Sequence, residues 1–322
     1  MDKPESESAL FDVIIIGSGP AGLTAAIYAG RALIKTLVIG GRLPGGQLML
    51  TSGVENFPGF SNGVQGQELM QEIRKQAERF GAQIVDEDVE SVDFSRKPLH
   101  VTAGGREYAA NAVIIATGSS AKWLSLPSEV KLRGRGVSSC ATCDGYFFRE
   151  RRVVVVGGGD TALEEALFLT KYATEITVIH RRDQLRASKI MQARAMNNKK
   201  IRFVWNSVVD EILGSAKVEG VKIKNMVTGE FFMIPCDGVF VAIGFQPNTK
   251  VFQGQIELDE KGYVVSGHET ATSVKGVFVA GDVHDHKYRQ AVTAAGEGCK
   301  AAIDALGYLE ELKEITVEAQ EK

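Results

Sequence analysis

The chain has 322 residues, of which 44% are hydrophobic and 24% charged, and its formal net charge at pH 7 is −3. This length favours two domains, each with enough apolar residues for its own core. The weak negative charge argues against a nucleic-acid partner or an anionic membrane surface, and no apolar stretch is long enough to span a bilayer.

The two termini and the cysteine count indicate a compartment. The chain begins with MDKPESESALFD, which lacks the basic and apolar regions of a signal peptide. Four cysteines are too few for a secreted disulfide framework in a chain of this length. The end of the chain, ELKEITVEAQEK at residues 311–322, is typical of a frayed or solvated tail. We therefore expect a cytoplasmic protein.

A repeated pattern organises the chain. Residues 13–30 read VIIIGSGPAGLTAAIYAG, which is a β-branched run, a glycine-rich turn and an apolar pattern at helical spacing. A second apolar run, TLVIGGR, follows at residues 36–42. Residues 153–170 (VVVVGGGDTALEEALFLT) and 176–182 (ITVIHRR) align with these segments without a gap. Each copy predicts a βαβ unit whose first strand is buried on both faces.

The glycines of both copies have the spacing of a dinucleotide-binding turn. The corresponding positions are Gly17, Gly19 and Gly22 in the first copy and Gly157, Gly159 and Ala162 in the second. The first glycine permits a tight turn, the second lets the backbone approach a pyrophosphate, and the third position packs helix on strand. Amides at the start of the following helix can bind the phosphates. Two copies in register favour two dinucleotide-binding domains over a chance glycine turn.

The ends of the second strands differ between the copies. A unit that binds an adenosine ribose often has an acid here for the 2′-hydroxyl. The second copy instead has His180, Arg181 and Arg182, with Arg186 further on, and guanidinium groups suit a 2′-phosphate. This copy therefore predicts NADPH, with a solvated basic surface as the alternative. The first copy carries Arg42 at the matching place, so the residues alone leave a second NADP site open.

Three later segments also end in small-residue turns. AVIIATGSS (112–120) and GVFVAIGFQPN (238–248) each predict a strand that ends one domain and leads to the other. Residues 276–302 predict a strand, a loop and a helix that begins near Arg289. Asp282 in this loop could accept hydrogen bonds from a polyol such as ribitol, or it could be an ordinary turn or N-cap acid.

A pair of cysteines precedes the second copy. Cys140 and Cys143, in CATCDG, can close a small disulfide and accept two electrons, which is the number that a hydride carries. A zinc site usually needs four ligands, and Cys236 and Cys299 are isolated in apolar contexts, so we expect no metal. A thioredoxin-like fold is not expected either, because no strand is predicted to lead into a helix at Cys140. His284 and His286 form an HxH pattern without further ligands in view.

Together these segments resemble the low-molecular-weight thioredoxin reductases of bacteria, plants and fungi, in the class II pyridine nucleotide-disulfide oxidoreductase family. The shared motifs keep the family's order and spacing over about residues 10–310, and they are GSGPAG, GGQL, VENFPGF, ATG, SSCATCDG, GGGDTA, HRRD and VFVAGDVHDHKYRQAVTAAG. CATCDG is the most specific, because flavoprotein relatives that reduce ferredoxin or other small partners lack the dithiol.

The resemblance implies an α/β fold with two Rossmann-like dinucleotide-binding domains, the second inserted in the first. Residues 1–118 and 248–322 would form the FAD domain, and residues 119–247 the NADPH domain with the dithiol. Connectors near 118–122 and 244–248 would join the domains. The family also implies a homodimer, with thioredoxin as the protein substrate and no membrane or nucleic-acid partner.

The resemblance assigns site residues as well. Those expected at FAD are Gly17, Ser18, Gly19, Pro20, Ala21, Gly22, Gly40, Gly41, Gly45, Gly46, Gln47, Asn56, Ala116, Thr117, Gly118, Gly281, Asp282, Arg289, Gln290 and Ala291. Those expected at NADPH are Gly157, Gly159, Asp160, Thr161, Ala162, His180, Arg181, Arg182, Arg186, Ile243 and Gly244. Cys143 would lie nearest the flavin and Cys140 would attack the partner. Asp144 would be the general acid, with an ordinary turn aspartate as the alternative.

We therefore predict an NADPH-dependent thioredoxin-disulfide reductase that uses FAD and the Cys140–Cys143 pair. A related enzyme could use another acceptor, either as a peroxiredoxin-reducing flavoprotein or as a small-molecule dithiol oxidase. The former usually has an extra thioredoxin-like N-terminal module, which this chain is expected to lack. A flavin-binding redox sensor without turnover is the third hypothesis, and the intact CATCD motif and both glycine turns argue against it.

Overall fold

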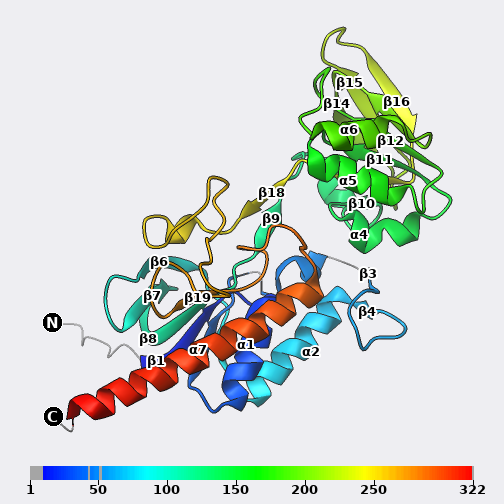
Figure 1. Ribbon diagram of the computed structural model, residues 1–322. Coiled ribbons are helices and arrows are strands. Elements are labelled where there is room, and N and C mark those ends of the chain that lie inside the picture. Colours follow the sequence, from blue (N-terminus) through cyan, green and yellow to red (C-terminus); the bar gives the residue numbers. More distant parts are fainter. Residues whose placement is uncertain (1–9, 43, 51–52, 321–322) are drawn as a thin grey trace, which may run out of the picture. The chain divides into compact units, whose positions relative to one another are not determined.

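The chain forms two compact units (Figure 1). The computed structural model describes residues 10–42, 44–50 and 53–320. Met1–Ser120 and Gln246–Lys322 belong to the first unit, and Ala121–Phe245 form the second. In the sequence, the second unit is therefore one continuous stretch between two parts of the first.

The chain passes from one unit to the other in two segments that pair with each other. Strands β9 (Ser119–Ala121) and β18 (Phe245–Pro247) form a two-stranded sheet. On either side of it, the Lys122 amide donates to the Gly244 carbonyl at 2.9 Å, and the Asn248 amide donates to the Gly118 carbonyl at 3.0 Å. The two connecting segments therefore lie side by side.

The first unit is built on one large sheet. Its further elements are β1 (Leu10–Ile16), α1 (Pro20–Arg31), β2 (Thr36–Ile39), η1 (Gly46–Leu50), β3 (Gly53–Val54), β4 (Val64–Gln65), α2 (Gly66–Arg79), β5 (Gln83–Val85), β6 (Val89–Asp93), β7 (Leu99–Ala103), β8 (Arg106–Ile115), η3 (Lys250–Phe252), β19 (Val277–Val279) and α7 (Ala291–Gln320). The strand order is β5-β2-β1-β8-β7-β6, and β19 pairs with β8 as well. Strands β5, β2, β1, β8 and β19 are parallel, whereas β7 and β6 are antiparallel to their neighbours.

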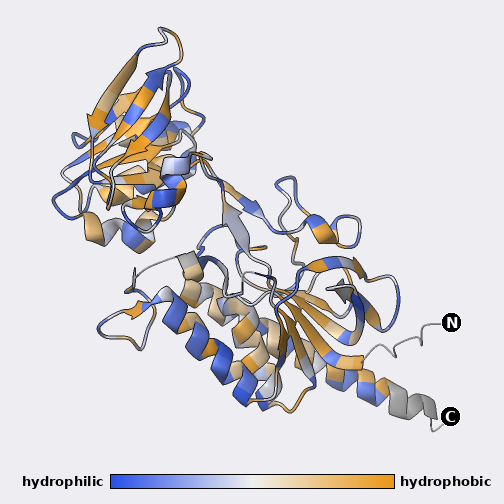
Figure 2. Cartoon of the chain, turned by 180° about the vertical axis from the view of Figure 1, so that it is seen from behind, coloured by the Kyte–Doolittle hydropathy of each residue, from blue (hydrophilic) through white to orange (hydrophobic). Residues whose placement is uncertain are grey.

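The central strand β1 is buried on both faces from Val13 to Ile16, because these four residues are all apolar and β-branched. Val13 and Ile15 belong to a core that they share with the helices α1, α2 and α7, which lie together on one face of the sheet (Figure 1). Ile14 and Ile16 belong to a second core on the opposite face. In Figure 2 the strands of this sheet are mostly hydrophobic, whereas α2 has a hydrophilic outer side.

The second unit repeats this plan on a smaller scale. Its elements are α3 (Pro127–Leu132), β10 (Val137–Ser138), α4 (Ala141–Asp144), η2 (Gly145–Phe148), β11 (Arg152–Val156), α5 (Asp160–Leu169), β12 (Glu175–Ile179), α6 (Lys189–Met196), β13 (Ile201–Val204), β14 (Ser207–Leu213), β15 (Gly220–Asn225), β16 (Phe231–Pro235) and β17 (Gly238–Val241). A parallel sheet, β10-β17-β11-β12-β13, has α5 and α6 on one face. The antiparallel sheet β14-β15-β16 packs on the other. The predicted α/β fold with two Rossmann-like units is confirmed.

The prediction of a frayed tail is wrong for the backbone of residues 311–320, because α7 continues to Gln320. Leu312 still packs against the core that α7 shares with α1, so the helix has a partner at this point. Glu311, Lys313 and Glu314 are exposed, in agreement with the predicted solvation. The polar residues at positions 311, 313 and 314 are therefore the solvated side chains of a helix.

Helices α1 and α7 touch through their backbones at Gly298. A Cβ atom added to Gly298 would lie 2.0 Å from the Ala21 carbonyl oxygen, whereas a Cβ added to Gly307, on the same helix, would have nothing within 4 Å. We expect Gly298→Ala to lower the free energy of unfolding by about 1–3 kcal/mol through overpacking. Gly307→Ala should raise it by up to about 1 kcal/mol, because alanine is the better helix former. Urea unfolding of both variants measures the difference, and a Gly298→Ala protein as stable as Gly307→Ala would contradict the close contact.

Candidate active site

The first glycine turn lies beyond the carboxyl end of β1, and it has no space for side chains on its inner side. A Cβ on Gly17, whose φ is +114°, would lie 2.3 Å from the Ala116 carbonyl oxygen, and a Cβ on Gly22 would lie 1.9 Å from the Gly17 carbonyl oxygen. A Cβ on Gly19 would have nothing within 4 Å. The turn is therefore closed towards the sheet and open where a pyrophosphate can approach the backbone, so its shape fits a dinucleotide.

Ser18 ties this turn to the other predicted glycines. Its buried hydroxyl donates to the Gly40 carbonyl at 2.8 Å and accepts the Gly45 amide at 3.0 Å. A Cβ on Gly46 would lie 3.4 Å from the Gly19 Cα, so Gly46 also lies against the turn. The structure therefore gathers these predicted residues at one edge of the sheet, where the carboxyl ends of the parallel strands meet.

Acids that the sequence interpretation missed surround Arg42. Its Nε lies 3.6 Å from Glu87 Oε2 and 3.8 Å from Asp88 Oδ2, and its amide donates to Asp88 Oδ1 at 3.0 Å. These ion pairs are exposed and contribute little stability. They do place negative charge where a 2′-phosphate would bind, which disfavours a second NADP site. The acids follow β5, so only the pairing of β5 with β2 brings them to Arg42.

The loop after β19 lies against the same turn. A Cβ on Gly281, whose φ is +80°, would lie 3.0 Å from the Ala21 Cβ, and the Ala280 amide donates to the Ile115 carbonyl at 2.9 Å. Asp282 is half-buried, and burial raises its pKa to about 7. The negative charges of Asp285 and Glu297 add to this shift, and Arg289 opposes it. A carboxyl group with this pKa can change its protonation near neutral pH.

Two side-chain amides join distant parts of the first unit. Asn56 Nδ2 donates to Gln290 Oε1 at 3.2 Å, which connects two residues expected at FAD. Asn248, which the sequence interpretation did not single out, donates from Nδ2 to the Thr117 carbonyl at 2.9 Å. The Thr117 hydroxyl donates back to the Asn248 carbonyl at 2.8 Å. No local pattern could have identified Asn248, because its partners are far away in the sequence.

The other residues expected at FAD take simpler positions. Pro20 and Ala291 are the first residues of α1 and α7. Gly41 has φ +78°, and Gln47 is exposed. Arg289 donates from Nη2 to the Tyr263 hydroxyl at 3.4 Å.

The two histidines of the HxH pattern separate in the structure: His284 lies against Glu297, and the His286 ring lies 5.3 Å from the Tyr263 ring. Over the described ranges, no cluster of three or more His, Cys, Asp or Glu side chains could hold a metal ion.

The second glycine turn repeats the construction of the first. A Cβ on Gly157, whose φ is +154°, would lie 2.4 Å from the Ala242 carbonyl oxygen and 2.7 Å from the Ala162 Cβ. A Cβ on Gly159 would have nothing within 4 Å. The shape again fits a dinucleotide. Ile243 and Gly244 directly follow Ala242, and Asp160 and Thr161 begin α5.

The arginine-bearing loop folds back onto this turn. The Arg186 amide donates to the Gly158 carbonyl at 2.8 Å, and the Ser188 amide donates to Asp160 Oδ1 at 2.8 Å. Arg181, Arg182 and Arg186 are exposed. In the part of the chain that the structure describes, none of the three has a carboxylate within 4.0 Å. Their charge is therefore available to an anionic ligand, unlike that of Arg42.

His180 lies underneath this loop. Its ring is buried, Nε2 lies 3.0 Å from the Gln184 carbonyl, and a Cβ on Gly158 would lie 2.3 Å from the ring. Burial lowers the pKa of His180, and the charges of the nearby arginines lower it further. The structure therefore gives His180 the position of a neutral support for the turn.

Cys140 and Cys143 form a disulfide, with their Cα atoms 5.3 Å apart. The two-residue strand β10 leads to Cys140, which is the N-cap of α4. The expectation that no strand leads into a helix at Cys140 was therefore wrong. The reason is that β10 exists only through its pairing with β17, which a sequence of two residues cannot reveal. The surrounding five-stranded sheet still differs from a thioredoxin fold, because β10 is a short edge strand.

The register of this sheet places the disulfide near the second glycine turn. Strands β10, β17 and β11 are parallel neighbours in that order. Cys140 and Gly157 follow the carboxyl ends of β10 and β11, with β17 between them. Neighbouring strands are about 4.8 Å apart, so the two strand ends are about 10 Å apart. The disulfide and the second glycine turn therefore share one edge of the second unit.

Local hydrogen bonds distinguish the two cysteines. Cys140 Sγ accepts the Cys143 amide at 3.2 Å and lies 3.3 Å from the Thr142 hydroxyl oxygen. Both groups can stabilise a thiolate on Cys140.

Burial raises the pKa of Asp144, although a hydrogen bond from Ser138 opposes this shift. Asp144 can therefore hold a proton at higher pH than an ordinary aspartate.

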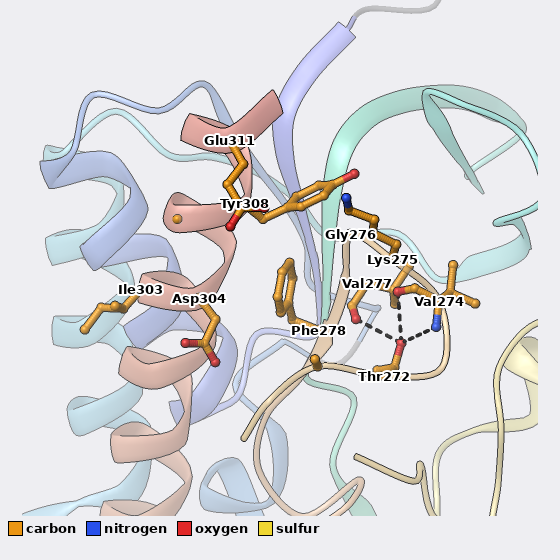
Figure 3. A pocket seen from close by; sticks show the side chains of 12 residues that line it. Thr272, Val274, Lys275, Gly276, Val277, Phe278, Ile303, Asp304, Tyr308 and Glu311 are labelled. Carbon is orange, nitrogen blue, oxygen red and sulfur yellow. Dashed lines mark hydrogen bonds between the residues drawn. The ribbon is translucent and has the colours of Figure 1, made fainter. Parts of the chain in front are cut away.

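A pocket of about 410 Å³ in the first unit takes no part in this site (Figure 3). It lies between α7 and the segment 271–278, and its lining includes Lys275, Asp304 and Tyr308. None of the residues expected at FAD or NADPH lines it.

Comparisons with known proteins agree with this arrangement. Residues 11–298 match the model of the family described as pyridine nucleotide-disulphide oxidoreductase. The chain is 55% identical over 302 residues to a protein of Rickettsia conorii named thioredoxin reductase. The aligned residues make up 92% of this chain and 97% of that one. It is 53% identical over 311 residues, 96% of this chain and 68% of the other, to a protein of Mycobacterium leprae named bifunctional thioredoxin reductase/thioredoxin. The solved structure of thioredoxin reductase from Giardia duodenalis matches with a TM-score of 0.90 and 45% identity, over 94% of this chain and 100% of that one.

The raised pKa of Asp282 has a consequence for stability. An unfolded aspartate titrates near pH 4, so between about pH 4 and 7 the folded chain binds the additional proton. The contribution of Asp282 to the free energy of unfolding therefore falls as the pH rises from about 4 to about 7. Asp282→Asn removes this dependence. In flavin-free protein, the free energy of unfolding of the variant minus that of the parent should therefore be larger at pH 8 than at pH 5 by about 1–3 kcal/mol. Urea unfolding at the two pH values tests this, and an equal difference at both would contradict it.

Proposed function

Because the chain belongs to the pyridine nucleotide-disulphide oxidoreductase family, we propose that it is a thioredoxin-disulfide reductase. The observation that carries the proposal is the Cys140–Cys143 disulfide, which shares one sheet edge with the second glycine turn. The names of relatives that are about half identical to this chain give additional support. Flavin and nicotinamide cofactors follow from the family, and we propose FAD and NADPH as the specific nucleotides.

The first unit would hold FAD. Its open glycine turn at Gly19 would receive the pyrophosphate, and Asp282 would accept hydrogen bonds from the ribityl hydroxyls. We assign residues 1–118 and 248–322 to this domain and residues 119–247 to the NADPH domain. A bound flavin supplies two-electron transfer between a nicotinamide and a disulfide.

The second unit would select NADPH through its arginines. Arg181, Arg182 and Arg186 belong to the loop that folds back onto the glycine turn, and their guanidinium groups suit a 2′-phosphate. His180 would keep this loop in place without adding charge, because burial favours its neutral form.

The reduced cysteines would transfer electrons by thiol–disulfide exchange. The Cys140 thiolate attacks one sulfur of the thioredoxin disulfide, which breaks that bond and forms a mixed disulfide. The Cys143 thiolate then attacks Cys140 Sγ, which re-forms the Cys140–Cys143 bond and releases thioredoxin with two thiols. Two electrons and two protons have moved to the partner. Asp144, whose pKa is raised by burial, would exchange protons with the thiols.

The proposal includes a homodimer, which the resemblance supports, and a cytoplasmic location, which the low cysteine count supports. Within the described residues, no helix is both long enough and apolar enough to cross a membrane. Sedimentation of the purified protein measures the oligomeric state directly.

The decisive assay follows NADPH oxidation with oxidised thioredoxin from the same organism. The purified protein should carry about one FAD per chain and should reduce thioredoxin catalytically. Turnover with a peroxiredoxin or a small dithiol, but not with thioredoxin, would contradict the proposed acceptor. A flavin-containing protein without any turnover would indicate a redox sensor.

Removal of one redox cysteine should stop the reaction at a defined step. Cys140→Ser should lower thioredoxin reduction at least about a thousandfold, because no mixed disulfide can form. Reduction of the bound flavin by NADPH should continue. Cys236→Ser is the matched control, because burial raises the pKa of this thiol to about 12 and it should not react. A Cys140→Ser enzyme with full turnover would contradict the assigned role.

Nucleotide choice should depend on the second copy of the repeat and not on the first. Replacing Arg181 and Arg182 with Gln should raise the KM for NADPH by about tenfold to a hundredfold per arginine, because each loses charge-assisted bonds to the 2′-phosphate. The KM for NADH should hardly change. Arg42→Gln is the control, since Arg42 has the matching position but is paired with Glu87 and Asp88. An equal effect on both nucleotides would mean that the arginines only support the fold.

A further inference from the structure

One carboxylate oxygen of α7 holds two points of the Asp282 loop. Glu297 Oε2 accepts the Gly281 amide at 2.6 Å and lies 2.9 Å from His284 Nε2. Because burial alone would raise the pKa of Glu297 but these bonds hold it below its usual value, the group is a carboxylate at neutral pH. A carboxylate can only accept, so His284 Nε2 carries the proton of this bond.

The part of α7 that carries Glu297 packs closely against α1. The adjacent Gly298 touches the backbone of α1, since a Cβ there would lie 2.0 Å from the Ala21 carbonyl oxygen. Gly281 approaches the same residue, with 3.0 Å between its added Cβ and the Ala21 Cβ. Helix α7, the Gly281 loop and the first glycine turn therefore meet at Ala21, and Glu297 links the loop to this contact.

Both bonds of Glu297 enclose Asp282. Gly281 precedes this residue, and His284 follows two positions later, after Val283, which is fully buried. The Gly281 carbonyl accepts the amides of His284 and Asp285 at 3.0 and 3.1 Å, which closes the turn around Asp282. The position of Asp282 is therefore fixed by hydrogen bonds of its neighbours Gly281 and His284, and not by bonds of its own side chain.

We propose that Glu297 is a positioning residue for the flavin: its carboxylate fixes the Gly281–His284 turn, and through it the Asp282 carboxylate that accepts from the ribityl hydroxyls. This inference rests on the proposed FAD site in the first unit and deepens it. The loss of these bonds frees the turn, so that FAD binding must pay the entropy of ordering Asp282.

The test is a double-mutant cycle in the holoprotein. FAD dissociation on dilution is followed by the rise in flavin fluorescence. Glu297→Ala should speed dissociation by about tenfold to a hundredfold, because two charge-assisted bonds are lost. Glu297→Gln keeps an acceptor oxygen and should speed FAD dissociation by a smaller factor than Glu297→Ala. Glu310→Ala, at an exposed position on the same helix, should stay within about twofold of the parent protein.

The Asp282→Ala background separates positioning from general destabilisation. If Glu297 acts through Asp282, Glu297→Ala should add less than about threefold to the dissociation rate in this background. An equal factor in both backgrounds would overturn the inference, as would a Glu297→Ala protein that behaves like Glu310→Ala or a Gln variant as poor as the Ala variant. A parent protein that binds no FAD would instead overturn the proposed function, and the inference with it.

Discussion

The whole arrangement depends on two places where backbone meets backbone without an intervening Cβ. In the first unit Gly17 touches the Ala116 carbonyl, and in the second Gly157 touches the Ala242 carbonyl. A side chain at either glycine would collide with that carbonyl, and at Gly157 also with the Ala162 Cβ of α5, so it would move the turn away from the neighbouring strand end. Because each contact joins the first strand of a βαβ unit to the strand beside it, it also fixes where the following segment begins. The segment that begins at Thr117 in the first unit and the segment that begins at Ile243 in the second therefore both start beside a glycine turn.

The same construction produces different electrostatic surroundings in the two units. An arginine follows the second strand of each copy at the same distance, Arg42 after β2 and Arg182 after β12. In the first unit, acids follow the neighbouring strand β5, and Glu87 and Asp88 among them pair with Arg42. In the second unit the neighbouring strand is β13, and Arg182 remains without a carboxylate partner among the described residues. The strand beside the repeat, and not the repeat itself, thus decides whether the arginine charge can serve a phosphate.

Sequence reasoning succeeded where the chemistry is local. The β-branched runs and the glycine spacing define β1, α1, β11 and α5, because buried parallel strands and tight turns need those residue types at those places. It failed where a role comes from a distant partner. Glu297 looks like any helix glutamate until the structure places it beside Gly281, and β10 has two residues that form a strand only by pairing with β17. The end of α7 likewise looked like a frayed or solvated tail, because its composition does not reveal that Leu312 packs against the core.

Strand β10 explains how one edge of the second unit can accommodate two chemical tasks. The second glycine turn follows the carboxyl end of β11, in the centre of the sheet. A dithiol at the end of β17 would compete with it for space, because Ala242 there already touches Gly157. The added edge strand moves the cysteines one strand further out while keeping them at the same level, since Ser138 aligns with Phe240 and Phe240 with Val155. Two residues of extra pairing therefore place the disulfide beside the second glycine turn without altering that turn.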